Sequence, residues 1–406
     1  MLDPNRIRLD FPEIVDGLIY LDNAASTLKP ISVVEEMRSF SLHEYANVHR
    51  GAYKLSIEAS VKYDKAREKV ARFINAEPSE VVFTYNSTDS LRRIALILLG
   101  NKVVSKGDEI LITEAEHHSN ILPWRGLARL SGASLRILPV DSEGVPRWDM
   151  LDDYLTERTK VFAFGHVSNV TGSIAPVEEV ARKAKERGTI VVLDSAQGAP
   201  HLSINVKDMN IDFLAFSGHK MLGPTGIGVL WMNRDLSEKL EPVFGGGGTI
   251  IDVYKDDDQV NVEWDESPLK WEPGTPPIIE AIGLSKAVEY LENIGMYEIT
   301  RYEEELTKLL FDLLEDSIRN KIRILGPLDP KRRLGIVSFT VEGYTVDAVA
   351  LYLSRRGIAV RTGKHCAHPL HYALKANEGS VRASLYLYNT ENDVERFVEA
   401  IESLIK

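Results

Sequence analysis

One lysine, Lys220, occupies a position where its amine could react with a carbonyl compound. It follows the apolar run Phe213–Phe216, which is typical of a buried strand, and it precedes a loop that contains three glycines. A lysine that is desolvated at the end of a strand can lose its proton and form a Schiff base. The cofactor that uses such a lysine is pyridoxal phosphate (PLP), which also requires a carboxylate for its ring nitrogen and a site for its phosphate.

Groups suited to this cofactor follow each of five candidate strands. Ligands of open α/β sheets bind at the carboxyl ends of the strands, so these groups should meet at one edge. Hydroxyls at a helix start favour a phosphate, a histidine ring can stack on the pyridine, and a carboxylate can pair with its nitrogen. The strands and the groups after them are Val81–Thr84 with Ser87 and Thr88, Glu109–Thr113 with His117, Val161–Gly165 with Ser168 and Asn169, Ile190–Leu193 with Asp194 and Gln197, and Leu214–Phe216 with Ser217, His219 and Lys220.

Each of these residues also has a purely structural interpretation. Asp194 and the Asn86–Thr88 stretch could cap helices, His117 could be an ordinary satisfied histidine, and Lys220 could be a solvated charge. Together these interpretations require several coincidences at one sheet edge. Neither a dinucleotide-binding glycine motif nor a P-loop occurs at a strand-to-helix turn, which excludes those nucleotide sites.

The single cysteine, Cys366, lies in a polar, glycine-containing stretch from Arg361 to Pro369. Nearby basic groups favour the thiolate, which is the nucleophilic form, so a reactive thiol on an exposed loop is predicted. Two alternatives are a small buried hydrophobic side chain and a metal site formed with His368 and His371. The metal site lacks a second ligand pair, so no metal is predicted.

Arg382 begins a candidate strand and could hold a substrate carboxylate through two parallel hydrogen bonds. A surface ion pair is the alternative interpretation.

The elements that position these groups indicate an α/β protein. Short apolar runs alternate with amphipathic helical stretches, as in βαβ units around a mainly parallel sheet. A long helix is expected over 279–293, and further strands over Ile336–Val341 and Val381–Leu387. The segment from Asp256 to Gly274 is polar and interrupted by Pro and Gly, which predicts a loop, and Gly245–Gly248 is expected to be a mobile loop.

Length and charge limit the remaining possibilities. A chain of 406 residues favours two domains. The net charge of −12 argues against nucleic acid and anionic membranes as partners. The longest apolar runs are too short to span a bilayer, and the N-terminus lacks the apolar core of a signal peptide. One cysteine allows no internal disulfide, which fits a cytoplasmic protein.

With these positions laid out, the chain resembles the cysteine desulfurases of PLP fold type I, within the class V aminotransferases. It is most similar to the group II branch, which includes the sulfur-mobilising and selenocysteine lyase-like enzymes. The resemblance covers nearly the whole chain. It rests on Tyr20–Ser26, Val48–Gly51, Glu116–Asn120, His166–Gly172, Asp194–Gln197, Ser217–Lys220, Glu272–Pro276, Arg361–Ala367 and Arg382–Ser384.

The resemblance implies a role for each candidate residue. Lys220 would hold the cofactor covalently, Asp194 would pair with its ring nitrogen, and His117 would stack on its ring. The sulfur would pass to Cys366. The other implied contacts are the phosphate with Ser87, Thr88, Ser217 and His219, the phosphate of the other subunit in a homodimer with Thr275, the ring oxygen with Gln197, the cofactor also with Asn169, and the substrate with Ala25, Asn169, Arg361 and Arg382.

The resemblance also implies a fold. We expect a large PLP-binding domain over 21–278 with a mainly parallel, seven-stranded sheet. A linking helix and a small α/β domain would follow over 279–406 and carry the cysteine loop, with residues 1–20 as an arm on the small domain. The implied reaction converts L-cysteine to L-alanine and leaves a persulfide for a sulfur-acceptor protein, such as an iron–sulfur scaffold or a small transfer protein.

Other reactions remain open at this point. The substrate could instead be selenocysteine or cysteine sulfinate, or the chain could be a non-catalytic sulfur carrier.

Two departures from the family pattern bear on the rate of turnover and on the sulfur acceptor rather than on the class of reaction. Asn86 stands where glycine is usual beside the phosphate, and Lys364 stands where histidine is common beside the thiol.

Overall fold

A central sheet organises the larger part of the molecule. The computed structural model describes residues 2–15, 17–317 and 320–405, and within them seven strands form this sheet in the order β2-β8-β7-β6-β5-β3-β4. β8 is antiparallel to both neighbours and all other pairs are parallel, which confirms the predicted mainly parallel sheet. The strands are β2 (Val81–Thr84), β3 (Glu109–Thr113), β4 (Ser134–Leu138), β5 (Thr159–Gly165), β6 (Ile190–Asp194), β7 (Phe213–Ser217) and β8 (Gly228–Met232).

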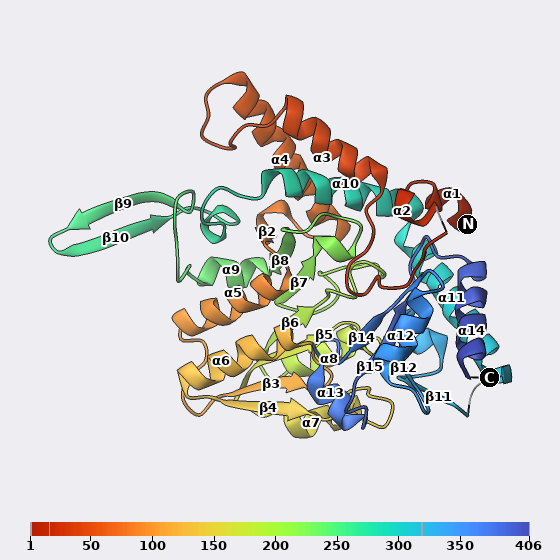
Figure 1. Ribbon diagram of the computed structural model, residues 1–406. Coiled ribbons are helices and arrows are strands. Elements are labelled where there is room, and N and C mark those ends of the chain that lie inside the picture. The colour runs from red at the N-terminus through yellow and green to blue at the C-terminus, as the bar shows by residue number, and fades with distance from the viewer. Residues whose placement is uncertain (1, 16, 318–319, 406) are drawn as a thin grey trace.

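Helices cover both faces of the sheet, because alternate residues of its strands point to opposite sides. Val192, Phe213 and Ala215 pack with the helices α5 (Ser87–Gly100) and α6 (Leu122–Ser131) on one face. Val191, Leu193 and Leu214 join the core on the other face. That face is covered by α3 (Ile31–His43), α4 (Lys54–Phe73), α8 (Val177–Lys185) and α10 (Ile278–Ile294). α10 is the long helix that the sequence predicts (Figure 1).

A smaller antiparallel sheet lies beside this body, with the order β11-β12-β15-β14. In its register Arg361 of β14 lies directly opposite Arg382 of β15, so two predicted substrate-binding residues are neighbours. Its strands are β11 (Ile322–Leu325), β12 (Ile336–Val341), β14 (Arg361–Gly363) and β15 (Ser380–Ser384), and the nearby helices are α11 (Met296–Ser317), α12 (Val346–Ser354), α13 (His368–Ala373) and α14 (Glu391–Ile405).

The N-terminal segment contacts both parts of the molecule. It contains α1 (Pro4–Arg8), α2 (Pro12–Val15) and β1 (Ile19–Tyr20), and β1 pairs in parallel with β13 (Ile358–Ala359). Arg8 forms an ion pair with Asp393 of α14 at 2.6 Å, whereas Phe11 is buried in the core of the larger part. On these contacts we propose the division into an arm (1–20), a large domain (21–278) and a small domain (279–406).

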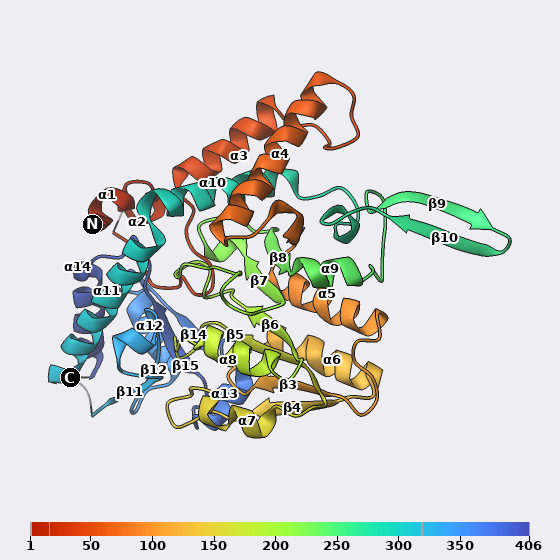
Figure 2. The same ribbon diagram turned by 180° about the vertical axis from the view of Figure 1, so that it is seen from behind.

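A two-stranded hairpin projects away from the body (Figures 1 and 2). It consists of β9 (Ile250–Asp256) and β10 (Gln259–Trp264), which follow α9 (Arg234–Lys239). The prediction of a loop from Asp256 to Gly274 is therefore wrong for β10. Apolar and polar residues alternate on either side of the polar turn at Asp257, which is the pattern of a hairpin. The prediction took the polar turn as part of a loop and overlooked this alternation. None of the helices in the described ranges is long and apolar enough to cross a membrane.

Candidate active site

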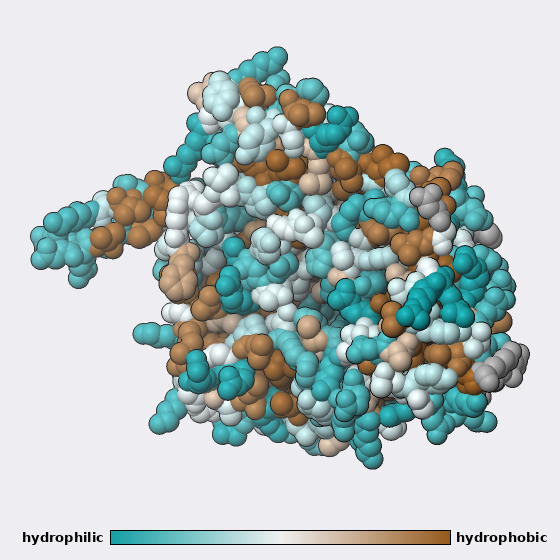
Figure 3. Space-filling view, viewed as in Figure 1, coloured by the Kyte–Doolittle hydropathy of each residue, from teal (hydrophilic) through white to brown (hydrophobic). Residues whose placement is uncertain are grey.

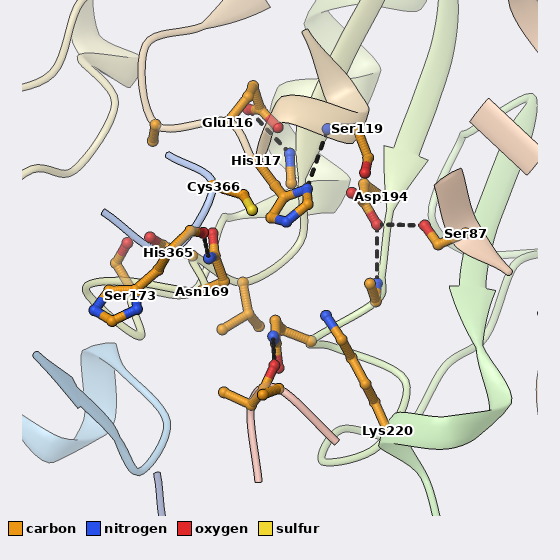
Figure 4. Close-up of a pocket in the computed structure, with 18 of the residues that line it drawn as sticks. Ser87, Glu116, His117, Ser119, Asn169, Ser173, Asp194, Lys220, His365 and Cys366 are labelled. Atoms are coloured by element: carbon orange, nitrogen blue, oxygen red, sulfur yellow. Dashed lines mark hydrogen bonds between the residues drawn. The ribbon is translucent and has the colours of Figure 1, made fainter. Parts of the chain in front are cut away.

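The predicted site residues other than Thr275 meet in one cavity of about 450 Å³ at the carboxyl ends of the parallel strands (Figure 4). Thr275 lies outside this cavity, in the loop before α10. Its predicted contact was with the other subunit, so it stays a prediction. The candidates that line the cavity are Ala25, Ser87, Thr88, His117, Asn169, Asp194, Gln197, Ser217, His219, Lys220, Arg361, Cys366 and Arg382.

Lys220 ends the short 3₁₀ turn η4 (Gly218–Lys220) that follows β7, and its amine points into the cavity. Burial lowers the pKa of Lys220 to about 8, and the nearby carboxylate of Asp194 opposes that shift. An amine with this pKa is partly unprotonated near neutral pH and can act as a nucleophile or a base.

The turn that carries Lys220 is fixed by an N-terminal segment far away in sequence. The carbonyl oxygen of His219 accepts hydrogen bonds from the Thr27 backbone N–H (3.1 Å), the Thr27 hydroxyl (3.2 Å) and the Lys29 amine (3.2 Å). The Ser26 hydroxyl donates to the same oxygen at 3.1 Å. Four donors on one carbonyl hold the backbone of the reactive lysine in place. Neither Thr27 nor Lys29 was predicted as part of the site.

Asp194, at the end of β6, presents a buried carboxylate. It accepts hydrogen bonds from the Ser87 hydroxyl and from the Ala196 backbone N–H, both at 3.0 Å. Burial raises the pKa of Asp194, and these two donors and the Lys220 ammonium oppose the shift. Gln197 donates through Nε2 to the carbonyl of Ala24 at 2.7 Å, while its buried Oε1 has no hydrogen-bond partner in the part of the chain that the structure describes.

The residues at the start of α5 also line the cavity. The Ser87 backbone N–H donates to the Ser217 hydroxyl at 2.9 Å, and the hydroxyls of Thr88 and Ser119 lie 2.6 Å apart. Hydroxyls at a helix start provide the donors that a phosphate needs.

Asn86 has an extended backbone there, with φ −175°, which any residue adopts, and its side chain caps the Asp89 N–H at 3.0 Å. The close approach at this point is made possible by Gly228 instead, because a Cβ there would lie 2.5 Å from the Asn86 Cα. The departure from glycine at position 86 therefore leaves the local backbone unstrained.

His117 lines the cavity, and its imidazole ring is neutral. Burial, and then the Lys220 charge, lower the pKa of His117 to about 3. Its Nδ1 accepts from the Ser119 N–H at 3.1 Å, so the proton of the neutral ring lies on Nε2. The adjacent Glu116 accepts from Asn120 Nδ2 (2.7 Å), the Gly165 N–H (3.1 Å) and the Thr113 hydroxyl, and thereby ties the His117 loop to β3 and β5.

The Cys366 loop closes the cavity from the side of the small sheet. His365 and Cys366 both have positive φ angles, 46° and 56°. Asn169 Nδ2 donates to the His365 carbonyl and the His118 N–H donates to the Cys366 carbonyl, each at 2.7 Å. Cys366 is exposed, as predicted, although its neighbours His365 and Ala367 are buried.

The surroundings of the loop bear on the role of Lys364 beside the thiol and on the alternative of a metal site. Lys364 contacts the ring of Tyr372, with Nζ 4.8 Å from the ring centroid. His371, a candidate metal ligand, is buried and bonds the Ser380 hydroxyl at 3.0 Å. Among the described residues, no group of three potential metal ligands occurs.

Two arginines line the cavity next to this loop. Arg382 donates through Nη1 to the Asn169 carbonyl at 2.9 Å and pairs with Asp22 at 3.7 Å, while its buried Nε has no hydrogen-bond partner among the described residues. Arg361 forms a two-bonded ion pair with Asp22, with Nε–Oδ1 at 3.0 Å and Nη2–Oδ2 at 2.8 Å. The sequence predicted both arginines but gave no role to Asp22, although Asp22 lies in one of the matched segments.

Comparison with known proteins identifies the family. The aminotransferase class-V family matches residues 19–397. The chain belongs to this family. A probable cysteine desulfurase of Aeropyrum pernix is 54% identical over 98% of this chain and 97% of its own length. One from Halalkalibacterium halodurans is 42% identical over 99% and 98%.

Solved structures agree with this assignment. The apo cysteine desulfurase of Thermococcus onnurineus NA1 has a TM-score of 0.94 and 41% identity, covering 100% of this chain and 98% of that chain. The Escherichia coli cysteine desulfurase CsdA has a TM-score of 0.91 and 35% identity, covering 100% and 99%. The predicted family and the predicted type I fold are confirmed.

The class-V aminotransferases are PLP enzymes, and the cavity fits that cofactor. Gln197 Oε1 is buried without a hydrogen-bond partner among the described residues, so it can accept a hydrogen bond from a bound group. Burial raises the pKa of the Asp194 carboxylate, so this group favours a protonated partner such as a pyridinium. The hydroxyls at the α5 start provide a phosphate site, and Lys220 provides the amine. Each part of the cofactor thus has a complementary group in the cavity.

Proposed function

We propose that this protein is a PLP-dependent cysteine desulfurase that converts L-cysteine to L-alanine and keeps the sulfur on Cys366. The observation that carries the proposal is that the Cys366 thiol and the Lys220 amine line the same cavity. Transamination uses a lysine but has no need of a thiol. The relatives described as cysteine desulfurases, at 42% to 54% identity, support this choice.

Cofactor contacts are proposed for seven residues besides Lys220. When bound, PLP provides an electron sink conjugated to the substrate Cα. Asp194 would hold the proton of the ring nitrogen, and Gln197 would donate to the ring oxygen after its amide turns or accept from it as it stands. His117 would stack on the ring. The phosphate would be held by Ser87, Thr88, Ser217 and His219.

The substrate would be oriented by two groups at the small-sheet side. The free Nε of Arg382 and the amide of Asn169 are suited to its carboxylate, since guanidinium–carboxylate pairs are strong and directional. Ala25 also lines the cavity, and its methyl group is too small to obstruct the amino acid. Lys220 Nζ would then take the Cα proton as a base, which its lowered pKa favours.

Cys366 would complete the reaction. Its thiolate attacks the substrate sulfur, the new S–S bond forms, and the carbon–sulfur bond breaks with its electron pair left on carbon. Protonation of that carbon gives the methyl group of alanine. The net change is a thiol plus cysteine to a persulfide plus alanine, so no external oxidant is required.

The test is a product assay. With L-cysteine and a reductant, the protein should form alanine and sulfide in equal amounts. Replacement of Cys366 by Ala should abolish both products while the PLP absorbance remains. Normal alanine release by Cys366→Ala would contradict the thiol step, and release from cysteine sulfinate alone would favour the desulfinase alternative.

Partners and location are also proposed. Cys366 is exposed, which supports transfer of the persulfide sulfur to an acceptor protein.

A homodimer would bring Thr275 of one subunit to the phosphate of the other. The hairpin β9–β10 supports this proposal, because it carries apolar side chains into solvent (Figure 3). A lone catalytic thiol that must stay reduced supports a cytoplasmic location.

A further inference from the structure

The loop that carries the thiol has a strained backbone. His365 and Cys366 are consecutive in the chain, and both have positive φ angles, 46° and 56°. This left-handed conformation is unfavourable for a residue with a Cβ, and it persists only where the surrounding contacts hold it. The contacts on either side of Cys366 therefore determine where its sulfur lies.

Buried contacts hold the part of the loop before the thiol. The His365 carbonyl accepts a hydrogen bond from Asn169 Nδ2 at 2.7 Å, and His365 Nε2 lies 3.1 Å from the Ser380 hydroxyl. His365 is only 8% exposed, whereas Cys366 is an exposed residue. The strained residue that bears the thiol thus lies at the outer edge of this buried anchor.

His118, which belongs to a different loop, contacts the part of the loop at and after the thiol. Its backbone N–H donates to the Cys366 carbonyl at 2.7 Å, and its ring Nε2 accepts from the His368 backbone N–H at 3.4 Å. The same Nε2 lies 3.0 Å from Nδ1 of the His368 ring. Because His118 Nε2 is the acceptor, His368 Nδ1 carries the proton and donates it. We call His118 and His368 the histidine clamp.

The turn that contains His118 is tied to the large sheet. Asn120, two residues later, donates through Nδ2 to Glu116 at 2.7 Å, and Glu116 accepts from the Gly165 N–H at 3.1 Å. Burial, and then the neighbouring His368, lower the pKa of His118, so its ring is neutral near pH 7 and can accept a hydrogen bond. The clamp therefore joins a strained loop to a firmly held turn.

We propose that His118 and His368 are positioning residues for the Cys366 thiol. By joining the two loops, they keep the left-handed backbone of Cys366 in place and its sulfur at the cavity. Without the bond between the rings, the backbone relaxes and the sulfur leaves the position from which it attacks the substrate. Both residues act through the loop rather than on the substrate. This inference rests on the proposed transfer of sulfur to Cys366 and deepens it.

The test separates the thiol step from the lysine step. His368→Ala removes the bond between the rings and should slow formation of the Cys366 persulfide about fivefold in a single turnover with L-cysteine, which is the effect of one exposed hydrogen bond. Mass spectrometry of the intact protein measures the persulfide directly, because Cys366 is the only cysteine in the chain. Exchange of the Cα proton of L-alanine in heavy water requires Lys220 but no thiol, so it should keep its wild-type rate.

Two further variants show whether the ring pair is the cause. His118→Ala should slow persulfide formation by the same factor, and the double variant should be no slower than either single variant, since each removes the same bond. His368→Asn places an amide N–H close to the position of Nδ1 and should restore most of the rate. His43→Ala is the matched control, because His43 is an exposed histidine at the end of α3, and it should have no effect.

A second measurement does not depend on turnover. In the PLP-loaded protein without substrate, the backbone amides of residues 364–368 should exchange with deuterium about fivefold faster in His368→Ala than in the wild type, because exchange requires local opening of the loop. His368→Asn should exchange at the wild-type rate.

Unchanged persulfide formation in both alanine variants, or losses that add in the double variant, would overturn the proposal. An equal loss of Cα proton exchange would also overturn it, because the effect would then arise at the cofactor rather than at the thiol. If the wild type forms no persulfide, the proposed function fails, whereas deuterium exchange still tests whether the clamp holds the loop.

Discussion

The reactivity of Lys220 comes from its place at the end of a buried strand rather than from a strong base beside it. Burial brings its pKa from 10.5 to about 8, although Asp194 pulls in the other direction. The unprotonated amine, which attacks a carbonyl, therefore becomes the main species above pH 8.

The rate at which apo-protein regains bound PLP should accordingly rise with pH and level off with a midpoint near 8. Absorbance at the wavelength of the bound cofactor follows this rate. Lys220→Ala should show no covalent reloading at any pH. A midpoint near the ordinary lysine value would contradict the desolvation argument.

Thr27 determines how firmly the lysine turn is held. Its hydroxyl donates to the His219 carbonyl and accepts from the Leu222 N–H at 2.8 Å. Thr27→Val keeps the shape but leaves the Leu222 N–H unpaired and removes one of the four donors to the His219 carbonyl, which costs about 1–3 kcal/mol. We expect PLP affinity to fall about tenfold, measured by fluorescence titration of the apo-protein, because 1.4 kcal/mol is a factor of ten. Thr27→Ser retains the hydroxyl and should bind PLP normally; an equal loss in both variants would argue against the hydrogen bonds.

Residue types next to predicted strands were sufficient to find most of the candidate residues that line the cavity. Lys220, Asp194 and His117 all follow strands whose carboxyl ends meet at one edge, so their convergence was predictable. Asp22 and Thr27 were not found by this route. Their partners, Arg361 and His219, are more than 190 residues away, and no local pattern reports such a contact.

At the scale of elements, the fit of β8 against the start of α5 shapes the phosphate end. Gly228 begins β8, and a Cβ there would lie 2.5 Å from the Cα and 2.6 Å from the carbonyl carbon of Asn86. Both atoms belong to the backbone, so the turn before α5 would have to move.

Gly228→Ala should therefore weaken PLP binding more than tenfold and lower the free energy of unfolding by about 1–3 kcal/mol, as overpacking does. PLP titration and urea denaturation measure the two effects. Gly126→Ala in α6 is the control, because its Cβ would meet nothing within 4 Å. Alanine in a helix should slightly stabilise the protein there. Normal PLP binding by Gly228→Ala would refute the close-approach argument.

Strands covered on both faces were predictable because they are short, continuous apolar runs, as β2, β3, β5, β6 and β7 are. β8 was missed although it is equally buried. It begins at Gly228, the last glycine of the loop that follows Lys220, and the glycines of this loop obscured the start of the strand. The predicted strand Val381–Leu387 ends earlier, at Ser384, where the chain turns to meet the N-terminal segment.

At the scale of the whole molecule, the N-terminal segment joins the two sheets. Asn23 donates to the Ser384 carbonyl at 2.6 Å, and the Ala24 N–H donates to the Ser384 hydroxyl at 2.9 Å. Four residues further on, the same segment binds the lysine turn. The cofactor site and the substrate arginines are thus positioned by one continuous stretch of chain, which explains why they keep a fixed relation although they belong to different sheets.

The hairpin presents an exposed apolar face on the single chain. Val253 pairs with Val262 and Lys255 with Val260 across the two strands, so Ile251, Val253, Val260 and Val262 share one face. Val260 is 70% exposed and Ile251 is 61% exposed. An isolated two-stranded hairpin is marginally stable in water, so this apolar face requires a cover. The proposed second subunit would provide it.

Val260→Asp should therefore shift the protein from dimer to monomer, because a charge would be buried in the covered face. Sedimentation equilibrium at micromolar concentration measures the shift, and PLP affinity should fall with it if Thr275 completes the phosphate site of the other subunit. Gln259→Glu is the matched control, since it adds the same charge on the opposite face of β10. A dimer that survives Val260→Asp would place the subunit contact away from this face. A wild type that is a monomer would reject the homodimer itself.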